Sequence, residues 1–103
     1  MMNRFGMFGE ITTIEGKRDE LVGILLEAAE AMNTLEECEL YIVSVKEEVP
    51  DGIWVTEVWQ NAEAHKASLS LDAVKMLIQK GRPLIKGMNT MNTFSPLGGK
   101  GLS

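Results

Sequence analysis

The spacing of apolar residues alternates along this 103-residue chain between a period of two and a period near 3.6. The first spacing is typical of strands and the second of amphipathic helices. A first strand is therefore expected at 5–14, and Gly16 ends its pattern. A helix follows from Lys17, with its apolar residues on one face. These residues are Leu21, Ile24, Leu25, Ala28 and Met32.

Two further strands are expected at 38–46 and 53–60. The segment Pro50-Asp51-Gly52 between them is a strong turn signal, because proline presets φ and glycine accepts a positive φ. The two strands should therefore pair as a hairpin.

Two helices and a last strand complete the predicted order. Asn61 can cap a short helix that begins at Ala62, and Ser70 or Asp72 can cap the helix after it. A weaker alternation at 88–94 predicts the last strand.

The order βαββααβ predicts an α+β domain of the ferredoxin-like kind, with a four-stranded antiparallel sheet. The chain length suits one domain, which we place at 1–96. The remaining segment, 97–103, contains three glycines and no periodicity, so we predict a flexible tail.

The strand at 38–46 carries apolar residues on both of its sides. Leu40 and Ile42 face one way, whereas Tyr41, Val43 and Val45 face the other. A sheet with only one covered face should alternate apolar and polar residues. Because so short a chain has helices for one face only, a second subunit should cover the other. This predicts a homodimer.

Composition narrows the partners and the compartment. The net charge of −5 disfavours binding to nucleic acid, whose phosphates it would repel. The single cysteine, Cys38, cannot form an internal disulfide, which fits a reducing compartment. No apolar run approaches the ~18 residues that cross a bilayer, and Met1 to Gly9 lacks the apolar core of a signal peptide. We therefore expect a cytoplasmic protein with no membrane partner.

Candidate functional residues gather between Val55 and Leu71, in the sequence VTEVWQNAEAHKASLSL. Glu57 and Trp59 are two apart on a predicted strand, so their side chains share one side. His65 follows in the first turns of the next helix and can meet them at the mouth of one pocket. As the only histidine, it is the natural proton acceptor at neutral pH.

This stretch resembles the antibiotic biosynthesis monooxygenase family, which includes small quinol monooxygenases. Members tend to carry a Glu-x-aromatic strand end followed by an Ala-His-x-x-Ser segment. Here these are Glu57-Val58-Trp59 and Ala64-His65-Lys66-Ala67-Ser68, and the resemblance spans 5–96. Two positions depart from relatives: Ser70 replaces a second histidine, and Gly9 aligns with the asparagine of the haem-degrading branch.

The resemblance implies a dimeric α+β barrel and a monooxygenase that works without metal, flavin or other cofactor. A small quinol- or phenol-like aromatic molecule would react with O₂ in an apolar pocket. His65 would be the base, Trp59 a stacking wall and Glu57 an orienting acceptor. Asn61 would donate a hydrogen bond to the substrate oxygen.

Less specific interpretations stay open at this point. A lone histidine at a helix start is often a surface residue with an exposed ring, and Trp59 could simply belong to the core or the dimer contact. One histidine and one cysteine cannot supply a structural zinc site. The alternative functions are a non-catalytic dimer that binds a small molecule and, less favoured because of Gly9, a haem-binding or haem-degrading protein.

Overall fold

The computed structural model describes residues 4–102, apart from the side chain of Thr90. Its elements follow the predicted βαββααβ order, with a short 3₁₀ helix before the last strand. In chain order they are β1 (Phe5–Thr13), α1 (Arg18–Met32), β2 (Cys38–Lys46), β3 (Val49–Trp59), α2 (Ala62–Ser68), α3 (Asp72–Gly81), the 3₁₀ helix η1 (Arg82–Leu84) and β4 (Ile85–Phe94).

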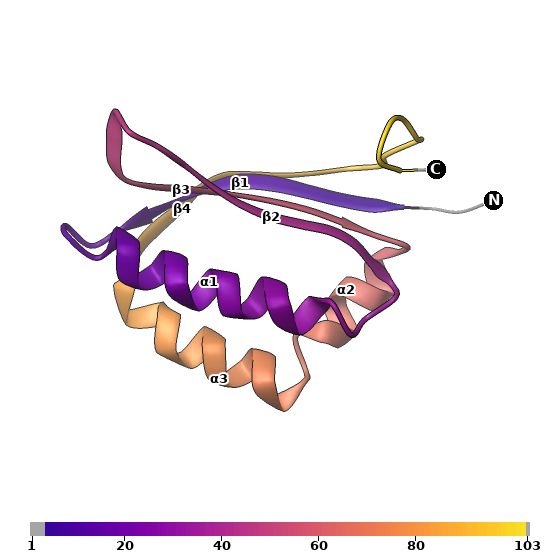
Figure 1. Ribbon diagram of the computed structural model, residues 1–103, viewed down its shortest axis with the longest axis horizontal. Coiled ribbons are helices and arrows are strands. Elements are labelled where there is room, and N and C mark those ends of the chain that lie inside the picture. The colour runs from indigo at the N-terminus through magenta and orange to yellow at the C-terminus, as the bar shows by residue number, and fades with distance from the viewer. Residues whose placement is uncertain (1–3, 103) are drawn as a thin grey trace.

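Within residues 4–102 the strands form one four-stranded antiparallel sheet in the order β2-β3-β1-β4. The predicted fold class is therefore confirmed. Figure 1 shows the long helices α1 and α3 on one side of this sheet, with α2 at the end where β3 stops. No helix of the described chain covers the opposite face of the sheet.

The α1 stripe predicted from the sequence faces the sheet. Leu21, Ala28 and Met32 are buried, and Leu21 packs with Ile11 and Ile53 in the larger core cluster. A smaller cluster joins Met32 and Trp59 at the other end of the helix. The core therefore lies between α1 and the two central strands, as the 3.6-residue spacing requires.

The predicted turn at Pro50-Asp51-Gly52 is wrong, because these residues belong to β3. Lys46 pairs with Val49, so the hairpin turns at residues 47–48. Pro50 is tolerated because it lies at the register irregularity between the Lys46–Val49 and Ser44–Trp54 pairs, and β3 pairs with β1 only from Gly52 onward. A Cβ at Gly52 would lie 2.8 Å from Val49 Cγ1, so this glycine serves close packing and not a turn.

The chain ends and the helices complete the description. No helix of the described residues is long and apolar enough to span a membrane. After β4 the chain turns back through positive-φ glycines, and Gly99 pairs with Leu102. The flexibility of the 97–103 tail and its separation from the 1–96 domain stay predictions.

Candidate functional site

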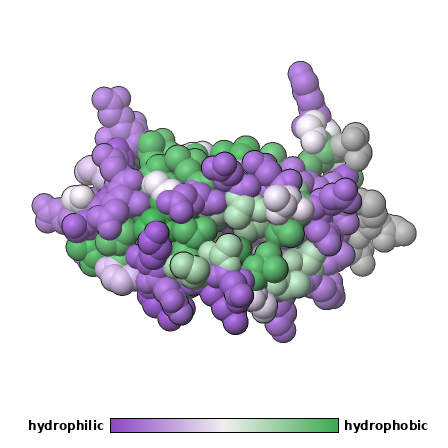
Figure 2. All heavy atoms as spheres, turned by 60° about the horizontal axis from the view of Figure 1, so that its bottom comes forward, coloured by the Kyte–Doolittle hydropathy of each residue, from purple (hydrophilic) through white to green (hydrophobic). Residues whose placement is uncertain are grey.

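An apolar cavity of about 470 Å³ lies between the helices and the sheet. Small-molecule sites in proteins have this size and this kind of wall. The whole α1 stripe lines it, together with residues of all four strands and of α2 and α3. Figure 2, turned toward the side of the helices, shows hydrophobic atoms reaching the surface there between hydrophilic side chains. Lining residues that are themselves exposed include Leu69, Ile78 and Met88.

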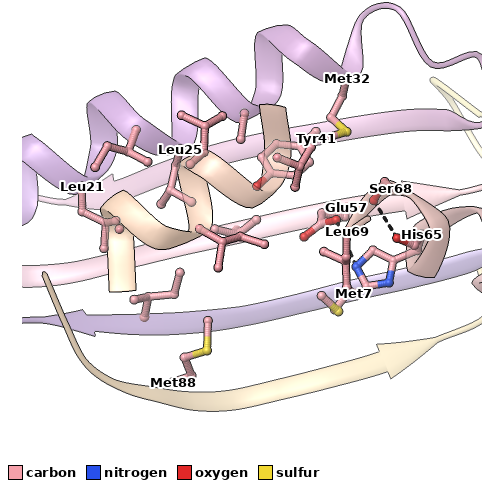
Figure 3. A pocket seen from close by; sticks show the side chains of 18 of the residues that line it. Met7, Leu21, Leu25, Met32, Tyr41, Glu57, His65, Ser68, Leu69 and Met88 are labelled. Carbon is pink, nitrogen blue, oxygen red and sulfur yellow. Dashed lines mark hydrogen bonds and ion pairs between the residues drawn. The ribbon is translucent and has the colours of Figure 1, made fainter. Parts of the chain in front are cut away.

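Strand register brings polar groups into this cavity from two neighbouring strands. Glu57 on β3 is directly opposite Tyr41 on β2 and Met7 on β1. Directly opposite residues in an antiparallel sheet point to the same face. All three line the cavity, and Figure 3 shows them grouped toward α2.

Glu57 is a buried carboxyl group with one firm partner. The Trp59 indole Nε1–H donates a hydrogen bond to Glu57 Oε1 over 3.0 Å. Burial raises the pKa of Glu57, while the Trp59 hydrogen bond and the nearby His65 oppose part of that rise. A raised pKa means that the neutral, protonated form gains weight at a given pH. Glu57 is therefore a group poised to exchange a proton inside an apolar wall.

His65 lies on α2 with its ring inside the cavity wall. Its imidazole is 5.2 Å from the Phe5 ring centre and 5.6 Å from that of Trp59, the latter edge-on. Only 17% of the side chain is exposed, so the expectation of an exposed surface ring is wrong. The reason is that α2 follows directly on the end of β3 and lays its first turns against the aromatic residues there.

The distance between His65 Nε2 and Glu57 Oε1 is 3.8 Å. This is an ion-pair distance if His65 is protonated, but it is longer than a hydrogen bond. Ser68, one turn along α2, donates its hydroxyl to the His65 carbonyl oxygen over 2.6 Å. The His-x-x-Ser pattern thus has a local structural role, because it ties the histidine to the next turn of its own helix. Figure 3 shows both contacts.

The predicted site residues are only partly brought together. Glu57, Trp59 and His65 line one cavity, whereas Asn61 is not among its lining residues. Asn61 caps α2, as predicted, because its Oδ1 accepts a hydrogen bond from the Ala64 N–H over 2.7 Å. A hydrogen bond from Asn61 to a substrate stays a prediction, and only the amide nitrogen is left to make it.

Tyr41 and Met7 were not predicted as site residues. Tyr41 is mostly buried, and burial raises the pKa of its hydroxyl above the ordinary range, so the phenol keeps its proton and can donate a hydrogen bond. For Tyr41 the only indication in the sequence was the alternation along its strand, which put it on the face opposite Leu40 and Ile42. The register with Glu57 could not be read from the sequence, since it depends on which strands pair.

Other reactive groups are poorly placed for chemistry. Burial raises the pKa of the Cys38 thiol to about 11, which disfavours the reactive thiolate. Among residues 4–102, no three His, Cys, Asp or Glu side chains are grouped so that they could hold a metal ion. Glu57 and His65 are therefore the residues of the cavity best placed for acid–base chemistry.

A model of the family "antibiotic biosynthesis monooxygenase" matches residues 4–80. The chain belongs to this family. A solved structure of a candidate antibiotic biosynthesis monooxygenase from Chloroflexus aurantiacus J-10-fl is 41% identical. The match covers 97% of this chain and 99% of that chain, with a TM-score of 0.89.

Solved structures of lower identity are also similar to this chain. A candidate monooxygenase from Caulobacter crescentus CB15 is 15% identical over 93% of this chain and 92% of that chain, with a TM-score of 0.83. A protein from Shewanella oneidensis is 16% identical over 93% of both chains, with a TM-score of 0.81. At these identities the likeness shows the fold alone. No curated protein matches the chain.

Proposed function

We propose that this protein is a cofactor-independent monooxygenase that oxidises a small phenol- or quinol-like molecule with O₂. The observation that carries the proposal is the polar end of the cavity, where His65 Nε2 lies 3.8 Å from Glu57 Oε1 within predominantly apolar walls. Such a reaction needs no cofactor, because the substrate itself supplies the electrons. It requires only a base in a site that excludes bulk water.

The proposed reaction begins when neutral His65 accepts the proton of a substrate hydroxyl group. The phenolate gives one electron to O₂, and the two radicals join at a hydrogen-bearing ring carbon ortho or para to the phenolate oxygen. The proton held by His65 passes to the terminal peroxide oxygen. Loss of the ring C–H proton from that carbon, with cleavage of the O–O bond, then leaves a quinone. One phenol and one O₂ thus give one quinone and one water.

The residues around His65 have separate roles in this proposal. In its ionised form, Glu57 stabilises the imidazolium that forms when His65 takes the proton, because opposite charges at this distance attract each other in an apolar wall. Tyr41 keeps its own proton and can donate a hydrogen bond to the developing phenolate. Trp59 offers an apolar face for the substrate ring and holds the Glu57 carboxyl group through its indole N–H.

The less favoured haem hypothesis meets a steric obstacle at Gly9. A Cβ at this position would lie 2.8 Å from the Met91 Cα on the neighbouring strand. An asparagine like that of the haem-degrading branch would therefore have to displace β4. This favours the oxygenase without a prosthetic group over haem degradation.

The proposal is tested by measuring O₂ uptake with a panel of quinols and naphthols. We expect turnover that survives EDTA and dialysis and needs no added flavin. His65→Ala should lower turnover by about 10²- to 10⁴-fold, the usual contribution of a positioned base. Added imidazole should restore part of the rate, because it can occupy the space left by the ring. A merely structural histidine would not give this rescue.

The control is Lys66→Ala, which changes the exposed neighbour of His65 on the same helix. This variant should keep the rate of the wild-type protein. His65→Ala should itself lose about 1–3 kcal/mol of stability, because its ring packs between Phe5 and Trp59. Assays are therefore run well below its unfolding temperature. Full activity of folded His65→Ala would remove His65 from the mechanism.

The non-catalytic alternative predicts a different result from the same panel. A binding protein would take up the aromatic molecules in the same cavity without consuming O₂. Saturable binding, followed by tryptophan fluorescence because Trp59 lines the cavity, would then be seen without turnover.

A further inference from the structure

Charge is confined to the two ends of the cavity. Of the 22 described residues that line it, three are acidic or basic: Glu57, His65 and Arg82. Glu57 and His65 lie toward α2. Arg82 opens η1, just before β4. The two ends of the cavity are therefore chemically different.

Strand register gives the separation of the two ends. Glu57 is opposite Met7 on β1, and Ile85, which follows η1, is opposite Thr13. Six residues of β1 separate these two rows, or about 20 Å at the usual rise of a strand. Only the single turn of η1 separates Arg82 from Ile85, so Arg82 lies near the far row. One continuous cavity thus extends along most of the sheet.

The wall between the ends is apolar. Figure 3 shows Leu21 and Leu25 on one side of the cavity and Met88 on the other, away from the group around Glu57 and His65. A ligand that fills this length must therefore have an apolar body between two polar ends.

Arg82 differs from the other two arginines of the chain in its contacts. Arg4 pairs with Glu39 over 2.8 Å, and Arg18 donates hydrogen bonds to the carbonyl oxygens of Lys46 and Val49. Among residues 4–102, no hydrogen bond or ion pair is made by the Arg82 guanidinium. Its fork of donors is therefore open to a carboxylate.

The backbone position of Arg82 is well fixed by packing. The preceding Gly81 is buried, and a Cβ there would lie 3.1 Å from Leu21 Cδ1 on α1. This close approach holds the end of α3 against α1 and sets where the Arg82 side chain begins. The backbone from which the Arg82 side chain extends is thus placed at the cavity by packed helices and not by a loose loop.

We propose that the ligand of this cavity is an elongated amphiphile with a terminal carboxylate at Arg82. Its polar ring lies at Glu57 and His65, and its apolar body lies between. The identity of the ring rests on the proposed function, whereas the carboxylate and the apolar body do not. The net charge of −5 disfavours the binding of anions in general. Binding of the ligand carboxylate would therefore depend on the local positive charge of the Arg82 guanidinium. Glu57, when ionised, repels the carboxylate and leaves one orientation.

The test is an anaerobic titration with hydroxyphenyl alkanoates of increasing chain length, each compared with its neutral primary amide. Without O₂, binding is measured and turnover is not. Affinity should rise with chain length until the carboxylate reaches Arg82. The acid should then bind on the order of tenfold more tightly than its amide. This preference should shrink at high salt, because Arg82 is exposed.

Matched variants separate a local contact from a general charge effect. Arg82→Gln should abolish the preference for the acid, and Arg82→Lys should keep part of it. Lys80→Gln removes the same charge two residues earlier, from an exposed side chain outside the cavity lining, and should keep the full preference.

Two results would overturn the proposal: equal affinity for acid and amide at every chain length, or equal loss of preference in Arg82→Gln and Lys80→Gln. The oxygenase proposal fails by a different result, an absence of O₂ uptake. If the protein binds the long acids without turnover, the proposal of an amphiphilic ligand stands and the oxygenase proposal is wrong.

Discussion

Glu57 is held in the cavity wall by a balance between burial and hydrogen bonding. Taking a carboxyl group out of water costs free energy unless partners replace the lost water. The Trp59 indole N–H is one such partner, at 3.0 Å. Burial still dominates and raises the pKa of Glu57. Burial of Glu57 therefore lowers the stability of the fold, but it places a proton-exchanging group in a cavity that has few others.

The raised pKa of Glu57 predicts a definite dependence of stability on pH. Between the ordinary pKa of a glutamate and the raised one, the folded protein holds a proton that the unfolded chain has lost. The contribution of Glu57 to stability is therefore full below the ordinary pKa and falls as pH rises through the folded pKa. Glu57→Gln keeps an acceptor for Trp59 without this titration.

We expect urea unfolding to show that Glu57→Gln becomes more stable relative to wild type as pH rises from about 4 to about 8. Glu63→Gln changes an exposed carboxylate on α2 and controls for the loss of one charge. If both variants followed the same pH trend, burial of Glu57 would not be its cause.

Two of the glycines within the helices and strands have opposite effects on stability. Gly23 lies exposed in the middle of α1, and a Cβ there would meet no atom within 4 Å. Gly23→Ala should therefore stabilise the protein by about 0.5–1 kcal/mol, since glycine is a poor helix former. Gly52 is buried, and a Cβ there would lie 2.8 Å from Val49 Cγ1 and 3.1 Å from Trp54 Cη2.

Gly52→Ala should accordingly destabilise the protein by about 1–3 kcal/mol through overpacking. Urea unfolding of the two variants beside wild type checks both signs at once. A stabilised Gly52→Ala would mean that β3 can shift away from the hairpin without cost, contrary to its pairing on both sides.

The order and approximate bounds of the elements follow from local patterns, and the sequence predicts them well. The helix over Arg18–Met32 and the strand over Cys38–Lys46 are examples. The hairpin turn was misplaced because Pro50-Asp51-Gly52 is favourable for a turn in isolation. Pairing of β3 with both β2 and β1 overrides that preference, and such pairing is not visible within a short window of sequence.

The site was predictable where residues lie close in the chain. Glu57, Trp59 and His65 share one strand end and the next helix, so parity and spacing bring them together. The remaining walls come from distant segments, such as the α1 stripe and Arg82. The stripe was predicted as one apolar face of a helix, and it does face inward. The size of the cavity beneath it, however, depends on the distance between α3 and the sheet. That distance is a property of the packed molecule.

At the scale of the whole molecule, the sheet has one face without helices in the described chain. Phe8 and Ile42 lie on that face, on either side of Thr56 in one row across the sheet. They are 42% and 46% exposed. A row of exposed large apolar side chains on a sheet is typical of a surface that another protein covers.

We expect a second copy of the chain to cover this face. Light scattering at micromolar concentration should then give about twice the 11.4 kDa mass of one chain. Ile42→Lys places a charge at the β2 end of the row and should weaken the dimer on the order of tenfold or more, because a buried unpaired charge is costly. Leu26→Lys alters an apolar residue of α1 that is 52% exposed, on the helix side, and should leave the mass unchanged. A monomeric wild-type protein would contradict this dimer.

Equal dissociation of the Ile42→Lys and Leu26→Lys dimers would contradict the proposed interface. Of these two residues only Ile42 lies on the uncovered face of the sheet, so only its replacement should weaken a dimer formed there.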